Sequence, residues 1–164
     1  WSPEARSGRL NSAPPILVVE DNDEDFDMLQ LAFQSAAVPN ALLRCQDGEE
    51  TLEFLRRQGR YEQSERALRP GLILLDLNLP GLDGRQVLES IKSDSQLRAI
   101  PVIVFSTSDN PRDVQSCYQL GASAYLLKPV DLERFERMVR LLKEFWLEFV
   151  VLPQGLPSQP ERWR

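Results

Sequence analysis

The chain has 164 residues, of which 42% are hydrophobic and 27% charged, and its formal net charge is −6. This length supports one well-packed domain, and the composition is typical of a globular α/β protein rather than a disordered or fibrous one. The acidic balance argues against the basic surface that nucleic-acid binding needs. No stretch resembles a signal peptide or approaches the length of a membrane span. We therefore expect a cytosolic protein that binds neither nucleic acid nor membrane.

Histidine is absent, and the two cysteines, Cys45 and Cys117, lie far apart without the spacing of a zinc or redox motif. The chain thus offers no imidazole for a metal site, for a Ser-His-Asp triad or for a phosphohistidine intermediate. We expect both cysteines to be reduced thiols in the core.

The first half of the chain alternates between apolar runs and segments of helical spacing. Residues 1–15 are rich in Ser, Pro, Arg and Ala, and we expect them to form a flexible lead. The pattern predicts strands at 16–19, 41–46 and 72–75, an acidic loop at 20–25, and helices from 26 to before 39 and from 47 onward. Asp47, with Glu50 three residues later, resembles a capping box. The connection over 56–69 is longer than such units usually need.

The second half continues the alternation. The pattern predicts helices through 87–91, over 111–121 and from about 131, and strands at 101–105 and 124–127. Asp83 is expected to cap the first of these helices, and Pro111 occupies the tolerated first position of the second. We place the domain at 16–150 and a tail at 151–164. Nothing after the last helix could form a helix-turn-helix, so no DNA-binding output domain is expected.

Five strands alternating with five helices predict a parallel sheet covered on both faces, because each parallel crossover needs a helical connection. The expected arrangement is flavodoxin-like, a doubly wound sheet with strand order 2-1-3-4-5. In such sheets, ligands bind at the carboxyl ends of the strands.

Acidic residues follow two of the predicted strands at that edge. Glu20 and Asp21 follow the first strand, and Asp76 ends the apolar run at 72–75. Uncompensated carboxylates there would repel one another, so the arrangement requires a cation. Oxygen ligands without His or Cys favour Mg²⁺ or Mn²⁺. A solvated acidic loop would explain residues 20–25 alone, but not an aspartate at the end of a buried strand.

A hydroxyl and an ammonium group follow the two remaining strands of the expected site, at Ser106 and Lys128. Taken singly, a turn serine and a surface lysine are the ordinary explanations. Combined with a carboxylate nucleophile and a divalent ion, however, they make a site suited to an acyl phosphate. Lys128 can pair with one phosphoryl oxygen and Ser106 can donate to another.

The segments ILVVEDN, LILLDLNLPGLDG, PVIVFSTS and GASAYLLKPV, in this order, resemble the receiver family of two-component response regulators over about residues 15–148. The resemblance implies that Asp76 accepts a phosphoryl group from a sensor histidine kinase. It also implies that Glu20, Asp21, Asp76 and the backbone carbonyl of Asn78 hold Mg²⁺. Self-phosphorylation and slow autodephosphorylation would accompany this signalling role, which is not that of an enzyme.

The same resemblance implies roles for the later strand ends. Ser106 would be the switch hydroxyl, Lys128 the phosphate-pairing lysine with a cis bond to Pro129, and Tyr125 the switch aromatic, although a core-packed strand tyrosine is the alternative. Glu20 stands where the family more often has Asp, and Ser106 where Thr is frequent, but both keep the chemistry. The long connection and the extended last helix resemble single-domain regulators paired with bacterial phytochrome kinases.

Three other functions share parts of the pattern. A haloacid-dehalogenase-type phosphatase also forms an aspartyl phosphate, but needs a second Asp where this chain has Asn78. A flavodoxin would need a Gly- and hydroxyl-rich phosphate loop after the first strand, where carboxylates would repel phosphate. A degenerate, purely structural receiver is the third, and the full set of site residues argues against it.

The last predicted helix has more apolar surface than one sheet can cover. One stripe consists of Leu132, Phe135, Val139, Leu142, Trp146 and Phe149. A second stripe contains Met138, Leu141 and Phe145, and apolar residues continue to Leu152. We expect a homodimer with Met138, Leu141, Phe145 and Phe149 at its interface. The alternative is a tail that folds back over the core.

Overall fold

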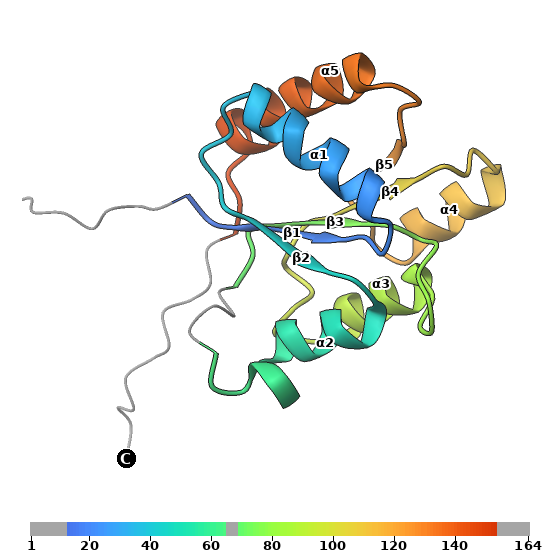
Figure 1. Cartoon of the computed structure of the whole chain (residues 1–164). Coiled ribbons are helices and arrows are strands. Elements are labelled where there is room, and N and C mark those ends of the chain that lie inside the picture. Colours follow the sequence, from blue (N-terminus) through green and yellow to red (C-terminus); the bar gives the residue numbers. More distant parts are fainter. Residues whose placement is uncertain (1–12, 65–68, 154–164) are drawn as a thin grey trace, which may run out of the picture.

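A parallel sheet of five strands forms the centre of the molecule (Figure 1) in the computed structural model, which describes residues 13–64 and 69–153. The strands are β1 (Ile16–Val19), β2 (Leu42–Cys45), β3 (Leu72–Leu75), β4 (Val102–Ser106) and β5 (Ala124–Leu127). Their order is β2-β1-β3-β4-β5, and every pairing is parallel. The flavodoxin-like prediction is therefore confirmed. The strand β4 lies one residue later than predicted, so that Ser106 is its last residue.

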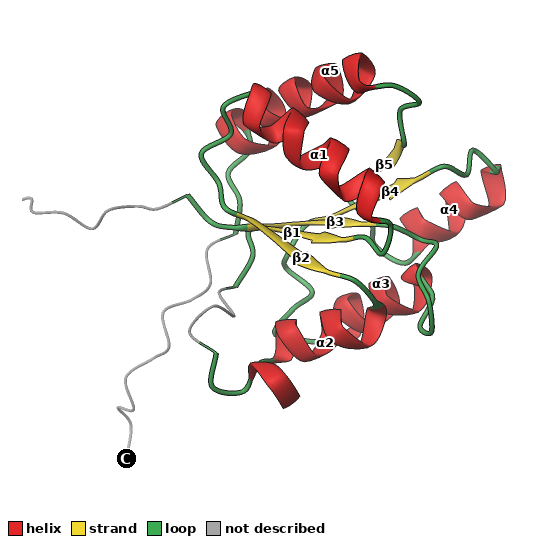
Figure 2. Cartoon of the chain, in the orientation of Figure 1, coloured by secondary structure: helices red, strands yellow, loops and turns green. Residues whose placement is uncertain are grey.

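Helices cover both faces of the sheet. They are α1 (Asp23–Ser35), α2 (Gly48–Arg56), α3 (Gly84–Ser93), α4 (Pro111–Gln119) and α5 (Leu132–Leu142), with a short 3₁₀ turn η1 (Gly59–Tyr61) in the long connection after α2. The helices α1 and α5 lie on one face, and α2, α3 and α4 on the other (Figure 2). In the described part of the chain, no helix is long and apolar enough to cross a membrane.

Side chains cap the helices where the sequence indicated, with two differences. Asp83 and Gln86 form a complete capping box at α3. At α2, Asp47 accepts from the Glu50 amide at 2.7 Å, but Glu50 accepts from Gln46, one residue before the cap. The helix α1 begins at Asp23 rather than at the predicted position 26, because Asn22 caps it.

The core has two halves, one on each face, because successive strand residues point to opposite sides. Leu17 and Val19 pack with α2, α3 and α4, whereas Ile16 and Val18 pack with α1 and α5. Cys45 and Cys117 are fully buried free thiols in the first half, as predicted.

The last helix departs from the predicted stripe. Phe135, Val139 and Leu142 are buried as expected, but Leu132 is 42% exposed and Phe149 79% exposed. The cause at the far end is η2 (Lys143–Phe149), a π-helical continuation of α5. The wider π turn shifts the phase of the helix, so that Trp146 and Leu147 pack on the core and Phe149 turns outward. At the near end, Leu132 is simply the first residue of α5, beyond the edge of the core.

Candidate functional site

The register of β1 and β3 brings Glu20 and Asp76 together at the carboxyl edge of the sheet. Val19 is paired with Leu75, and the Asp76 amide donates to the Val19 carbonyl at 3.0 Å. Both acidic side chains are almost completely buried, Glu20 at 2% and Asp76 at 4% exposure. Asp21 is exposed, yet one oxygen from each of these three carboxylates lies within 4.8 Å of the others. The three carboxylates among the four predicted metal ligands are thus adjacent.

Lys128 reaches this cluster from the end of β5. Its Nζ lies 2.7 Å from Glu20 Oε2 and 3.1 Å from Asp76 Oδ2, and its side chain is only 7% exposed. The Lys128 amide donates to the Ser106 carbonyl at 2.8 Å, which extends the β4–β5 pairing by one step and fixes where the lysine leaves the sheet. The ammonium also lies 5.6 Å from the centre of the Phe105 ring.

The cluster is short of positive charge. Burial raises the pKa of Glu20 to about 7; the hydrogen bond from Lys128 opposes this rise, and the charge of Asp76 adds to it. Burial alone would lower the pKa of Lys128, but its bonds to Glu20 and Asp25 and the charge of Asp76 raise it above the usual value. One ammonium therefore faces several carboxylates, two of them buried. An all-oxygen donor set with surplus negative charge fits a hard divalent cation such as Mg²⁺ or Mn²⁺.

Ser106 and Tyr125 both contact the loop that follows β4. Ser106 is fully buried, and its Oγ accepts from the Ser108 amide at 3.1 Å. The Tyr125 hydroxyl donates to the Ser108 carbonyl at 2.8 Å, while its partly buried ring packs against the core. The same loop is tied to α4, because Ser108 Oγ donates to Asp113 at 2.6 Å, and Asp113 in turn pairs with Arg85 of α3.

The loop after β3 holds Asp76 tightly. The exposed Asn78 donates its amide to Asp76 Oδ1 at 3.1 Å. Gly84, at the start of α3, donates to the Leu77 carbonyl at 3.0 Å, and a Cβ on Gly84 would collide with the Asp76 carbonyl oxygen. A glycine is therefore needed for this close approach.

Two residues at the site were missed from the sequence. Asp25 Oδ2 lies 2.9 Å from Lys128 Nζ, but residue 25 was predicted only as the end of the acidic loop, with no role at the site. Arg44 of β2 donates to the carbonyls of Glu20 at 3.0 Å and Asp21 at 3.3 Å. The available signal for Arg44 was an arginine within an otherwise apolar strand. The signal for Asp25 was the N-cap at Asn22, since it places Asp25 in a helical turn.

One expectation about the backbone is wrong. In the described residues no peptide bond is cis, so the bond between Lys128 and Pro129 is trans. The trans form is the intrinsic preference of bonds that precede proline, and the cis expectation came only from the resemblance.

Comparison with known proteins shows the family to which the chain belongs. The family model for the response regulator receiver domain matches residues 16–140. The response regulator Rcp1 of Synechocystis is 44% identical over 144 residues, which cover 87% of this chain and 96% of Rcp1.

Two solved structures are similar throughout the fold. The Mn²⁺-bound form of Rcp1 has a TM-score of 0.78 at 42% identity, and the phosphorylated cyanobacterial phytochrome response regulator RcpA has 0.79 at 42% identity. In each case the match covers 86% of this chain and 99% of the other. The chain belongs to the response regulator receiver family, and it is similar to single-domain regulators of phytochrome systems.

Proposed function

We propose that Asp76 accepts a phosphoryl group from the phosphohistidine of a sensor histidine kinase, and that Mg²⁺ is the ion required. The observation that carries this proposal is the buried carboxylate of Asp76 at the end of β3, within 3.1 Å of the Lys128 ammonium and beside Glu20. A phytochrome kinase is the proposed partner, because RcpA is a phytochrome response regulator. The domain is proposed to span 16–150, of which the family model matches 16–140.

In the proposed reaction, a carboxylate oxygen of Asp76 attacks the phosphorus atom in line with the leaving imidazole. The P–O bond forms as the P–N bond breaks, and the electron pair of that bond returns to the imidazole nitrogen. Mg²⁺, held by Glu20, Asp21, Asp76 and the Asn78 carbonyl, would neutralise charge on the phosphoryl oxygens. Lys128 pairs with one of these oxygens as a compact ammonium, already inside the site before the donor arrives.

Small phosphoryl donors need no kinase surface, so the same site supports self-phosphorylation, and water admitted to the acyl phosphate supports slow autodephosphorylation. We propose both activities, together with the cytosolic location expected from the sequence.

The proposed output begins at Ser106. A phosphoryl oxygen on Asp76 would draw the Ser106 hydroxyl toward it and away from the Ser108 amide, which now donates to Ser106 Oγ. Since the Tyr125 hydroxyl holds the Ser108 carbonyl, a shift of this loop changes the partner of Tyr125. The loop is also fastened to α4 through Asp113, so the change extends to the face formed by α4 and β5.

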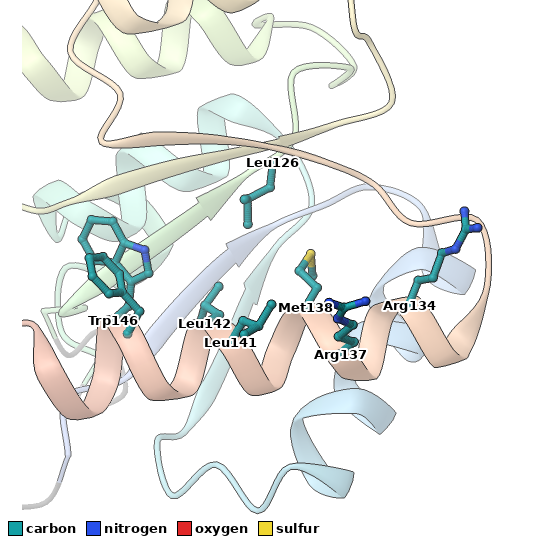
Figure 3. A pocket seen from close by; sticks show the side chains of 8 residues that line it. Leu126, Arg134, Arg137, Met138, Leu141, Leu142 and Trp146 are labelled. Atoms are coloured by element: carbon teal, nitrogen blue, oxygen red, sulfur yellow. The ribbon is translucent and has the colours of Figure 1, made fainter.

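We further propose a homodimer through α5 and η2. A groove of about 320 Å³ lies along this helix, and its walls are mainly apolar (Figure 3). Several side chains of this surface are exposed: Leu141 at 56%, Phe145 at 58% and Phe149 at 79%. Burying a few such side chains, at about 1.5–3 kcal/mol each, offsets the cost of association. Met138 is half-buried and lines the groove.

The alternative, a tail folded back over the core, accounts for part of the remaining apolar surface. Leu152 is half-buried and approaches Gly71, whereas Val151 is 93% exposed. Residues beyond 153 lie outside the described part of the chain. Light scattering at micromolar concentration tests the dimer. We expect twice the mass of one chain for the unmodified protein, and the mass of a single chain for Phe145→Glu. A monomeric mass that Phe145→Glu leaves unchanged contradicts it.

Phosphorylation by acetyl phosphate tests the site. Asp76→Asn should abolish labelling while the circular-dichroism spectrum stays unchanged, and neutralising both Glu20 and Asp21 should abolish Mg²⁺-dependent labelling and Mg²⁺ binding in a titration. Full labelling of Asp76→Asn, or undiminished Mg²⁺ affinity in the double variant, would refute the assignment.

A further inference from the structure

Lys128 is held by a carboxylate that is not among the three gathered for the metal. Asp25 Oδ2 lies 2.9 Å from Lys128 Nζ, and the Asp25 side chain is 35% exposed, in contrast to the buried Glu20 and Asp76. The group of oxygens within 4.8 Å of one another consists of Glu20, Asp21 and Asp76. Asp25 thus contacts the lysine from the side of α1, whereas the other partners follow strands.

The local sequence fixes Asp25 in this place. Asn22 caps α1, and its side chain accepts from the Asp25 amide at 2.9 Å, which sets the first helical turn. Asp25 therefore sits on the regular backbone of the helix rather than in a mobile loop, and its carboxylate points to the end of β5, 103 residues away in the sequence. Asp27, in the same helix, is exposed.

Phosphorylation changes the charge that the other two partners, Asp76 and Glu20, offer to Lys128. In the acyl phosphate, the Asp76 carboxylate has become part of an anhydride and has lost its charge, and Glu20 would be engaged by the divalent cation of the proposed site. Asp25 is then the partner that keeps its full charge for the lysine. Without it, the flexible four-carbon side chain of Lys128 would be less ordered, and more of its ordering would have to be supplied by the phosphoryl group itself.

We propose that Asp25 is a positioning residue that holds the Lys128 ammonium against the phosphoryl group when Asp76 is phosphorylated. This inference rests on the proposed function of Asp76 and Lys128. It assigns to the first turn of α1 a part in phosphoryl recognition, in addition to the metal ligands just before that helix.

A double-mutant cycle on the full chain tests the inference. The readout is the affinity for beryllofluoride, a phosphoryl mimic, by calorimetric titration at saturating Mg²⁺. Asp25→Ala should weaken binding about tenfold, the effect of losing one charge-assisted hydrogen bond. In a Lys128→Met background the same change should alter the affinity less than about twofold, because the partner is gone. The matched control is Asp27→Ala, which should leave the affinity unchanged in both backgrounds.

Three results separate the possible failures. Equal losses from Asp25→Ala with and without Lys128 would overturn the inference, because Asp25 would then act independently of the lysine. Unchanged affinity in Asp25→Ala, together with a clear loss in Lys128→Met, would overturn the inference but leave the proposed function intact. If Lys128→Met itself binds as tightly as the unmodified protein, the proposed role of Lys128 fails and the inference fails with it. Asp25→Asn, which keeps the shape of the side chain but removes its charge, should also weaken the binding of beryllofluoride.

Discussion

Replacing Lys128 by methionine should destabilise the metal-free protein, because it removes the ammonium that faces two buried carboxylates. The Lys128 side chain is 7% exposed, and its partners Glu20 and Asp76 are 2% and 4% exposed. Breaking a buried pair by removing one partner costs about 3–5 kcal/mol, since the remaining charge stays buried. Glu20 can take up a proton, so we expect the lower end, about 3 kcal/mol at pH 8. That corresponds to a decrease in melting temperature of about 6–12 °C.

The loss of stability in Lys128→Met should be smaller at low pH. The pKa of Glu20 is raised from 4.5 to about 7 in the folded protein, so the folded state binds this proton more tightly than the unfolded chain. The stability contributed by this proton is fully present below pH 4.5 and is lost as the pH rises toward 7. Without Lys128, which lowers this pKa, Glu20 would hold its proton to still higher pH. The variant should therefore be closer to the unmodified protein at pH 5 than at pH 8.

Thermal and urea unfolding at pH 5 and pH 8, without metal and with saturating Mg²⁺, measure these effects. Mg²⁺ should reduce the difference in stability between Lys128→Met and the unmodified protein at pH 8, because a bound cation replaces the missing positive charge. The matched control is Arg134→Met, which removes a cation that is 70% exposed and 3.6 Å from Asp131. It should change the stability by less than about 0.5 kcal/mol. Equal stability of Lys128→Met and unmodified protein at pH 8 without metal would refute the reasoning.

Two further predictions concern the surroundings of the site. Gly84→Ala places a Cβ against the Asp76 carbonyl and 2.6 Å from Leu77 Cα. The substitution should therefore lower the free energy of unfolding by about 1–3 kcal/mol. An unchanged midpoint of urea unfolding would contradict this. Burial raises the pKa of the Cys45 thiol to about 12. The native protein should therefore not react at Cys45 with a thiol reagent at pH 8, and Cys45 should react only after the protein unfolds. Rapid labelling of Cys45 in the native state would show that this thiol is accessible.

The strand order was predictable because each strand is a short apolar run, and parallel strands with helical crossovers have few possible arrangements. The edge of the sheet that gathers Glu20, Asp76 and Lys128 followed from the same rule, since polar residues come directly after buried strands. The family was identified from the same segments, and the comparisons confirm it.

Features that depend on distant packing were not predictable in this way. The contact of Asp25 with Lys128 joins residues 103 positions apart. The only local signal for it is the N-cap at Asn22, which places Asp25 in the first turn of α1. The helical period alone does not encode the π-helical turn after Leu142, which brings Trp146 and Leu147 onto the core. The exposure of Phe149 follows from that turn.

The most direct test of the central claim is to locate the phosphoryl group. After transfer from a phosphorylated histidine kinase in Mg²⁺, borohydride reduces an aspartyl phosphate to homoserine, which peptide mass spectrometry identifies by position. We predict homoserine at position 76, and none when Mg²⁺ is removed by a chelator. Transfer that leaves Asp76 unmodified, or that places the group on another carboxylate such as Asp21 or Asp25, would contradict the account.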